Sequence, residues 1–295
     1  MENTILKIQN VSKTYGQVKA LIDFTYDFGP GVYALLGPNG SGKSTLMNII
    51  TDNLKADSGE ITYKGTEILK LGAAFREKLG FMPQYPGMYP SFTALDFLSY
   101  IAVLKGVKRK AAKKQISDLL EAVELTDVRR HKIKSFSGGM KQRLALAQAF
   151  IGDPEIIILD EPTAGLDPKQ RISVRNYISE NAVSKTVIIA THVVQDIEFI
   201  SREIIMLKKG VILDSGSVSS LREKAFGKVW ETSINEEDFG TARENYRIVN
   251  VRSEGDKIFF RVLSDTKPDE NSTEAAPSLE DYYLYCFGEK AHEAI

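Results

Sequence analysis

Residues 37–45 read Gly37-Pro38-Asn39-Gly40-Ser41-Gly42-Lys43-Ser44-Thr45. An apolar run, Val32–Leu36, comes before this stretch and a second, Leu46–Ile50, comes after it, which predicts a buried strand, a glycine-rich turn and a helix. Glycines let backbone N–H groups turn inward and surround phosphate oxygens at a helix N-terminus. Lys43 can then reach the β- and γ-phosphates of a nucleotide, and the Ser44 hydroxyl can bind Mg²⁺. The spacing matches the phosphate-binding loop pattern and predicts a nucleotide site.

Length, charge and cysteine content narrow the class of protein. The 295 residues allow one large domain and a small one, and 38 basic against 39 acidic residues give no reason to expect nucleic acid as a partner. We interpret the basic run Lys105–Lys114 as the solvated face of a helix. The single cysteine, Cys286, excludes an internal disulfide and suits a reducing cytosol. The sequence begins without a signal peptide, and no apolar stretch approaches the roughly 18–20 residues that span a bilayer, so we expect a cytoplasmic protein.

The chain before and just after the phosphate loop has the alternation of β-strands. Residues 5–11 and 18–28 are predicted to be strands, and Tyr15 falls in the turn between them. An exposed tyrosine there either stacks on a purine ring or is an ordinary turn residue. Residues 59–63 and 79–84 are predicted as further strands, the second of which ends at Gln84.

From residue 93 to about residue 125 the apolar spacing becomes helical. Two helices are predicted there, inside a helical insert of about residues 85–153 that separates two β-rich blocks. A third helix is predicted to begin in the stretch Ser137-Gly138-Gly139-Met140 and to run to about residue 151. Ser137 is a suitable N-cap, and the paired glycines expose backbone N–H groups at the positive end of the helix dipole. This helix start is a second potential anion site.

An apolar strand over residues 155–159 leads into two carboxylates, Asp160 and Glu161. Such a strand suits the centre of a parallel sheet, where ligands bind at the carboxyl ends of the strands. Asp160 can hold Mg²⁺ there, directly or through water, and Glu161 can orient or deprotonate a water that attacks the γ-phosphate. Residues 186–190 are predicted as the next buried strand. His192 at its tip is either incidental or placed to contact the γ-phosphate.

The last seventy residues have a different character. Strands are predicted at 228–234, 246–252 and 257–263, then a mobile loop at 264–278 and a helix at 279–285. The aromatic residues could form a small core: Trp230, Phe259, Phe260, Tyr282, Tyr283 and Phe287. The segment carries no phosphate or metal motif. It is therefore either an interaction domain or a passive extension that covers apolar surface.

Taken together, these motifs resemble the ATP-binding subunit of an ABC (ATP-binding cassette) transporter over residues 5–225. The resemblance implies an α/β fold with a P-loop NTPase core, an N-terminal antiparallel β subdomain and a helical insert. It places an ATP-binding domain at 1–225 and a small α+β accessory domain at 226–295. The matching residues are Tyr15 (adenine-stacking loop), Gly37–Thr45 (Walker A), Gln84 (Q-loop), Ser137–Met140 (signature), Ile156–Asp160 (Walker B), Glu161 (catalytic carboxylate), Asp167 (D-loop) and His192 (switch histidine).

The resemblance also implies a division of roles among these residues. ATP and Mg²⁺ would be the cofactors; the implied catalytic residues are Glu161, His192 and Gln84, and the implied metal ligands are Ser44, Gln84 and Asp160. ATP would lie on Tyr15 and the Walker A residues of one subunit, closed over by Ser137, Gly138 and Gly139 of another in a head-to-tail homodimer or heterodimer. The partner would be a polytopic transmembrane subunit that holds the ATPase on the inner face of the membrane, coupled through Gln84 and docked on Tyr85–Phe92.

Two positions depart from the family pattern and bear on the direction of transport. The signature usually begins with Leu and ends with Gln, where this chain has Phe136 and Met140. Met at that position, and the tail Pro277–Asp281, are similar to bacterial exporters that carry the ATPase on a separate chain, which favours export. The alternative is a soluble ABC-type ATPase of translation or DNA repair. The insert is too short for the long coiled coils of the repair proteins, and only one cassette is present. A P-loop kinase would leave the signature and His192 unexplained.

Overall fold

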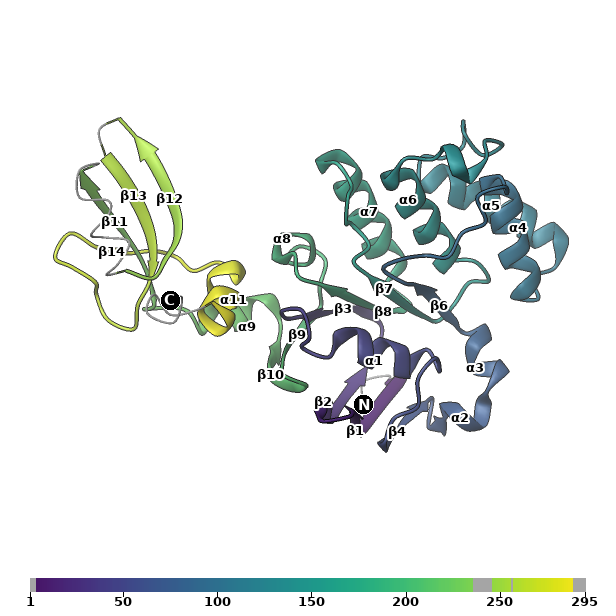
Figure 1. Ribbon diagram of the computed structural model, residues 1–295, viewed down its shortest axis with the longest axis horizontal. Coiled ribbons are helices and arrows are strands. Elements are labelled where there is room, and N and C mark those ends of the chain that lie inside the picture. The colour runs from purple at the N-terminus through teal and green to yellow at the C-terminus, as the bar shows by residue number, and fades with distance from the viewer. Residues whose placement is uncertain (1–3, 236–245, 256, 289–295) are drawn as a thin grey trace. The chain divides into compact units, whose positions relative to one another are not determined.

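The computed structural model describes residues 4–235, 246–255 and 257–288. The chain divides into two compact units, Met1–Ser215 and Gly216–Ile295 (Figure 1). The α/β fold class expected from the sequence is confirmed, because a largely parallel sheet, an antiparallel sheet and a group of helices make up the first unit. The predicted boundary at residue 225 lies ten residues beyond this division, and its functional meaning stays a prediction.

The N-terminal sheet of the first unit is antiparallel, as expected. Its strands are β1 (Leu6–Tyr15), β2 (Val18–Phe28), β4 (Ser58–Tyr63) and β5 (Thr66–Glu67), in the order β2-β1-β4-β5. The sequence placed Tyr15 in a turn, but this was wrong, because β1 continues to Tyr15, which pairs with Val18. Register shifts along β1 interrupt the alternation of buried and exposed side chains after Ile8. The second half of the strand therefore lacks the two-residue period by which strands are predicted.

The central sheet positions the site. Its strands are β3 (Gly31–Leu36), β6 (Leu79–Met82), β7 (Ile156–Asp160), β8 (Thr186–Thr191), β9 (Glu203–Lys208) and β10 (Val211–Gly216), in the order β10-β9-β3-β8-β7-β6. Strands β9, β3, β8, β7 and β6 run parallel. Leu36 pairs with Thr191, and Asp160 pairs with Ala190, so β3, β8 and β7 end at one edge of the sheet. The phosphate loop, the carboxylates and the switch histidine all follow these ends.

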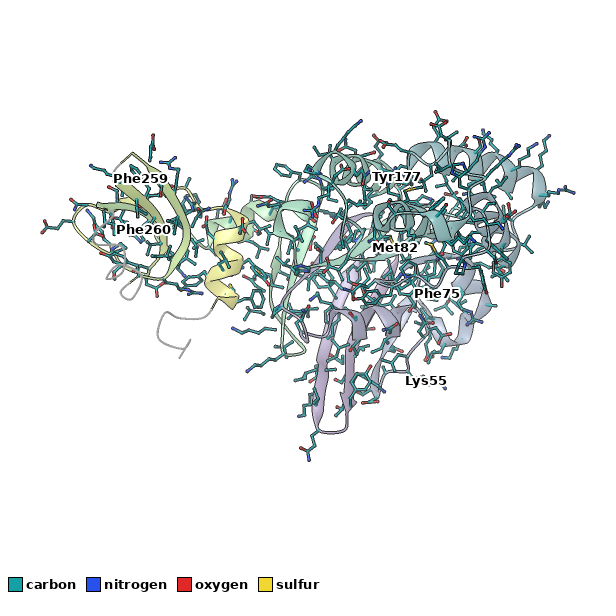
Figure 2. All side chains as sticks on the ribbon, turned by 45° about the horizontal axis from the view of Figure 1, so that its top comes forward. Lys55, Phe75, Met82, Tyr177, Phe259 and Phe260 are labelled. Carbon is teal, nitrogen blue, oxygen red and sulfur yellow. The ribbon has the colours of Figure 1, made fainter. Side chains whose placement is uncertain are left out.

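One hydrophobic core joins the two sheets of the first unit. Helix α1 (Lys43–Ile50) contributes Leu46 and Met47 to a cluster that also holds Ile8 of β1 and Ile158 of β7, all fully buried or nearly so. Two short helices that the sequence did not predict, α2 (Ile68–Leu71) and α3 (Ala73–Glu77), cover its edge. Phe75 of α3 is buried in the same cluster, and Figure 2 labels it within the first unit. Burial of these side chains is the dominant stabilising contribution.

The helical insert contains α4 (Ala94–Leu104), α5 (Arg109–Ala122), the 3₁₀ turn η1 (Ile133–Ser135) and α6 (Gly138–Ala149), which Figure 1 shows together at one end of the first unit. The Lys105 Nζ donates to the backbone carbonyls of Arg76, at 2.9 Å, and of Leu79. Burial lowers the pKa of Lys105. Gln115 joins the insert to the loop after α6, because its side-chain Oε1 accepts a hydrogen bond of 3.0 Å from the Gly152 N–H. The insert is thus fixed to the sheet by polar contacts as well as by packing.

The second unit is the small α+β unit that the sequence suggested. Its elements are α9 (Val218–Glu223), β11 (Val229–Asn235), β12 (Ile248–Glu254), β13 (Lys257–Leu263), β14 (Thr273–Glu274) and α11 (Leu279–Phe287), and its antiparallel sheet has the order β12-β13-β11-β14. The prediction of an unstructured segment at 264–278 was wrong at β14, which pairs with β11. Of the expected aromatic core, Phe260 and Tyr282 are buried, while Phe259, on the other face of β13, is partly exposed (Figure 2).

The segment Pro277–Asp281, which the sequence analysis singled out, begins the last helix. Ser278 is the N-cap of α11, and it exchanges hydrogen bonds with Asp281 in a capping box. Asp281 is 3% exposed and receives two hydrogen bonds from Arg261 of β13, at 2.9 and 2.7 Å. Burial would raise the pKa of Asp281, but the hydrogen bonds from Arg261 and Ser278 outweigh it and lower that pKa. This short motif therefore ties the last helix to the sheet.

Candidate functional site: the phosphate loop and the carboxyl ends of the central strands

The phosphate loop lies between β3 and α1. Gly42 has a φ of 109°, and a Cβ at this position would lie 2.4 Å from the carbonyl oxygen of Ala20, so no other residue fits. The Lys43 Nζ donates to the carbonyl oxygens of Gly37, at 2.6 Å, and of Pro38, at 3.1 Å. Burial lowers the pKa of Lys43. The lysine therefore crosses the loop, and the oxygens of a nucleotide can replace the two carbonyls as its partners.

The loop is suited to hold the phosphates of ATP. The Ser41 hydroxyl is buried, and it has no hydrogen-bond partner in the described part of the chain. Pro38, Asn39 and Gly40 are exposed, so the loop opens to a ligand. The first backbone N–H groups of α1 point toward the loop at the positive end of the helix dipole. An unpartnered buried hydroxyl, a lysine held only by carbonyls and a helix N-terminus together favour a polyphosphate.

Asp160 and Ser44 form the candidate metal site. Ser44, at the start of α1, lies near enough to Asp160, at the end of β7, to lower the pKa of that carboxyl. Burial and the neighbouring carboxylate of Glu161 raise the pKa of Asp160 to about 6, against the opposing effects of Lys43 and Ser44. A divalent cation would offset this repulsion. No group of three or more His, Cys, Asp or Glu within residues 4–235, 246–255 and 257–288 could hold a metal by itself. Mg²⁺ usually binds one or two protein oxygens together with phosphates and water, and Ser44 and Asp160 offer oxygens of this kind.

Glu161 lies at the centre of the site and is held by β8. It is 7% exposed and has a φ of 50°, in the left-handed region. Its carboxylate accepts hydrogen bonds from the Thr191 hydroxyl, at 2.9 Å, and from the His192 backbone N–H, at 3.1 Å, and lies 2.7 Å from the His192 Nδ1. The structure thus brings together two residues, Glu161 and His192, that are thirty-one positions apart. A left-handed conformation at a buried glutamate is a strained arrangement that is typical of functional sites.

Two partners of Glu161 escaped the sequence analysis. Thr191 was given no role, although its place directly before His192 is a usable signal. Gln142 of α6 donates from Nε2 to the backbone carbonyl of Glu161 at 2.7 Å. Its place five residues after Ser137 gave no indication of this contact, which depends on how α6 packs beside β7. Helix α6 and the residue that follows β7 are therefore in direct contact.

The signature and the D-loop lie side by side at an exposed surface. The Ser137 Oγ accepts a hydrogen bond of 3.2 Å from the Met140 N–H, which confirms Ser137 as the N-cap of α6. Asp167 caps α7 (Pro168–Asn181) in the same way. A Cβ at Gly139 would lie 3.4 Å from the side chain of Leu166 in the D-loop. Ser137 and Gly138 are exposed, and the described residues show no hydrogen bond between the signature and the phosphate loop.

Two further expected residues, Gln84 and Tyr15, are exposed. Gln84 follows β6 by two residues and is exposed, and β6 runs parallel to β7, so Gln84 lies at the same edge of the sheet as Asp160. Tyr15 is 49% exposed, with the Lys13 Nζ 6.0 Å from its ring centroid. An exposed aromatic ring at this place can accept a purine, as the sequence indicated.

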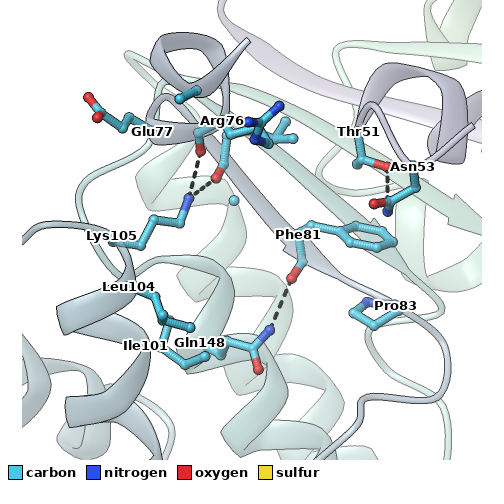
Figure 3. Close-up of a pocket in the computed structure, with 13 residues that line it drawn as sticks. Thr51, Asn53, Arg76, Glu77, Phe81, Pro83, Ile101, Leu104, Lys105 and Gln148 are labelled. Carbon is cyan, nitrogen blue, oxygen red and sulfur yellow. Dashed lines mark hydrogen bonds between the residues drawn. The ribbon is translucent and has the colours of Figure 1, made fainter.

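A separate cavity of about 530 Å³ lies between the insert and the core. Figure 3 shows Phe81 and Pro83 on one side, and Ile101, Leu104 and Lys105 of α4 on the other. Gln148 of α6 reaches the Phe81 carbonyl at 3.4 Å in the same view. No residue of the phosphate loop lines this cavity, so it is not part of the nucleotide site.

The fold and the site define a phosphate-loop ATPase, with a phosphate loop, a neighbouring serine and aspartate, and a glutamate-histidine pair directly after two adjacent parallel strands. Residues 22–164 match the ABC transporter family. The linearmycin resistance ATP-binding protein LnrL of Bacillus subtilis is 34% identical over 225 residues, which cover 76% of this chain and 72% of that protein. A Nod factor export ATP-binding protein I of Rhizobium etli is 32% identical over 76% of this chain and 72% of its own length. The chain belongs to the ATP-binding proteins of ABC transporters and is an ATPase.

Solved structures agree with this assignment. A dimeric bacterial ABC transporter cassette matches with a TM-score of 0.67 and 30% identity, over 72% of this chain and 98% of that one. The structure of an ATP-binding subunit of an ABC transporter matches with a TM-score of 0.70 and 25% identity, over 75% of this chain and 93% of that one. Within the described residues, no helix combines the length and apolar character that a membrane span requires.

Proposed function

We propose that this chain is the ATP-hydrolysing subunit of an exporter, and that it works as a head-to-tail dimer on the inner face of the membrane beside a polytopic transmembrane partner. The observation that carries the dimer is the exposed N-terminus of α6. Ser137 and Gly138 present backbone N–H groups to solvent and make no hydrogen bond to their own phosphate loop among the described residues. A partner's γ-phosphate is a suitable ligand for such a helix start.

Within each subunit we assign the hydrolytic roles as follows. Lys43 binds the β- and γ-phosphates, and Ser44 and Asp160 hold Mg²⁺, which neutralises charge on the phosphates. Glu161 accepts a proton from the attacking water, and His192 contacts the γ-phosphate from the next strand. Gln84 completes the metal side of the site. The observations that support these roles are the proximity of Ser44 to Asp160 and the 2.7 Å distance between the Glu161 carboxylate and the His192 Nδ1.

The cavity beside α4 is the proposed docking place for the transmembrane partner. Pro83 lines it and immediately precedes Gln84, so a segment bound there can move the Q-loop. The adjoining segment Tyr85–Phe92 is rich in exposed aromatic side chains. Tyr89 stacks against Phe92 with a centroid distance of 4.9 Å, and Tyr85 is 85% exposed. Apolar and aromatic groups around a hollow are typical of a surface that receives a partner's side chain.

Export is supported by the names of two relatives, one a linearmycin resistance protein and the other a Nod factor export protein. The molecule that is transported would be selected by the transmembrane partner. A soluble role in translation or repair is the competing hypothesis. Affinity purification from detergent-solubilised membranes separates them: a polytopic membrane protein should co-purify in stoichiometric amount, and ATP should drive transport out of cells carrying both. Recovery of ribosomes or DNA instead would refute the transporter role.

The second unit is proposed to be an interaction domain that holds two ATPase subunits together or contacts the transmembrane partner. Because α9 packs on α11, both helices belong to this unit, and a truncation after Ser215 removes it more cleanly than one after Ala225. The shortened chain should still bind ATP but should dimerise or support transport poorly. Unchanged transport in cells that carry only the truncated chain would leave the unit as a passive extension.

A further inference from the structure

A buried hydrogen bond links the two loops that carry the proposed catalytic pair. The Thr163 hydroxyl donates to the Oδ2 of Asp196 at 2.5 Å. Thr163 lies two residues after Glu161, and Asp196 lies four residues after His192, in helix α8 (Val194–Ile197). Thr163 is 3% exposed and Asp196 is 6% exposed. Neither residue belongs to the motifs that the sequence analysis used.

Helix α7 also contacts Asp196. Arg175 of α7 has its Nη1 3.9 Å from the Oδ1 of Asp196, and it donates to the backbone carbonyl of Gln195 at 3.0 Å. Its guanidinium lies 5.7 Å from the ring centroid of Phe199. Helix α7 begins at the D-loop. The loops after β7 and β8 and the D-loop helix are therefore all held to one carboxylate.

The space beside this contact leaves little room for a water molecule that could replace it. The cavity beside the pair measures about 10 Å³ and is lined by side chains that include Thr163, Arg175, Ile178, Ile189, Asp196 and Ile197. Such a space is at the lower limit for a single water molecule, and most of its lining is apolar. Removal of the Thr163 hydroxyl would leave a buried carboxylate with only the more distant arginine, and such a group shifts the chain around it to regain a partner.

We propose that Thr163 and Asp196 are positioning residues for ATP hydrolysis. Their hydrogen bond keeps the backbone that carries Glu161 fixed relative to the backbone that carries His192 when the direct contacts between these two residues change. The proposal rests on the roles proposed above for Glu161 and His192. In the structure the Glu161 carboxylate is occupied by Thr191 and His192. A water that donates a proton to Glu161 competes with these partners for the carboxylate, so the direct contacts change during hydrolysis.

The bond between Thr163 and Asp196 can outlast that change. It shares no atom with the Glu161 carboxylate. Glu161 also occupies a left-handed backbone conformation, which persists only where the surrounding structure fixes it. A fixed point two residues later, buried and independent of the nucleotide, supplies that restraint.

The test separates turnover from binding and from stability. In the complete chain, Thr163→Val removes the hydroxyl and keeps the shape of the side chain, and Thr163→Ser restores the hydroxyl. The matched control is Thr186→Val: Thr186 is also fully buried, and its hydroxyl donates to the Gly29 carbonyl at 2.7 Å, but at the other end of β8. For each variant kcat and KM for ATP, and the melting temperature, are measured. Glu161→Gln is measured beside them.

The expected result is a loss of kcat of about tenfold or more for Thr163→Val with KM nearly unchanged, since small misplacements of reacting groups have effects of this size. Thr163→Ser should recover most of the rate. Thr186→Val should lower the melting temperature but keep the wild-type kcat. If Thr163→Val and Thr186→Val behave alike, with kcat preserved while Glu161→Gln abolishes it, the positioning role is refuted and the base assignment stands. If Glu161→Gln also keeps the wild-type rate, the proposed site itself is wrong.

Discussion

Replacement of Glu161 by glutamine tests the site most directly, because the structure shows that this change should leave the fold intact. One carboxylate oxygen of Glu161 accepts a hydrogen bond from the Thr191 hydroxyl. The other accepts from the His192 backbone N–H and lies close to the His192 ring Nδ1. A glutamine can turn its carbonyl oxygen toward His192 and its amide toward Thr191, whose hydroxyl also accepts hydrogen bonds. The two donors of His192 then keep an acceptor, and only the Thr191 hydroxyl hydrogen loses the one it has in the wild type. We expect the free energy of unfolding to change by no more than about 1 kcal/mol, the net contribution of one hydrogen bond.

The rate of ATP hydrolysis by Glu161→Gln should fall strongly. An amide cannot take the proton of the attacking water, and a positioned general base contributes about 10²- to 10⁴-fold to rate. ATP binding should persist, because Lys43 and the loop around it are unchanged, and the ATP-bound dimer should become long-lived. Phosphate release measures the rate, calorimetry measures ATP affinity, and size-exclusion chromatography with ATP measures the dimer.

Glu155→Gln is the matched control, since Glu155 precedes the same strand β7 at the opposite edge of the sheet, where it pairs with Lys64. It should hydrolyse ATP at the wild-type rate. Hydrolysis by Glu161→Gln at near that rate would refute the assignment of Glu161 as the base. A loss of rate together with a large drop in melting temperature would instead show that the carboxylate holds the loop.

Other predictions concern the phosphates, the metal and the second unit. Lys43→Ala should weaken ATP binding itself, because it removes the positive charge that attracts the β- and γ-phosphates. Unchanged affinity in calorimetry would contradict the loop assignment. Asp160→Asn should reduce activity and its Mg²⁺ dependence together, as a magnesium titration of the rate would show. The lowered pKa of Asp281 means that its contribution to stability is complete above the pKa of an unfolded aspartate, about 4, and is lost as pH falls through the folded value. Arg261→Met should therefore destabilise the second unit most above that pH, and its difference from the wild type should shrink as pH falls, measured by proteolysis across that range.

The sequence by itself determined the elements and most of the site residues, because their signals are local. A glycine-rich turn between an apolar strand and a helix, and an apolar strand that ends in two carboxylates, each depend on neighbours within about ten positions. The same holds for Ser137 and Asp167, whose N-cap roles need only the first turn of α6 and of α7. The two short helices α2 and α3 and strand β14 escaped, because segments this short carry too few residues to show a period.

Tertiary structure decided which of these residues meet. The order of the central sheet places β8 between β3 and β7, and this brings the Glu161 carboxylate to His192 and the Ser44 hydroxyl to Asp160. Strand order depends on the packing of both faces of the sheet, and no local pattern encodes it. The bond between Thr163 and Asp196 is likewise invisible in the sequence, since two polar residues thirty-three positions apart become a pair only when two loops close over the same buried space.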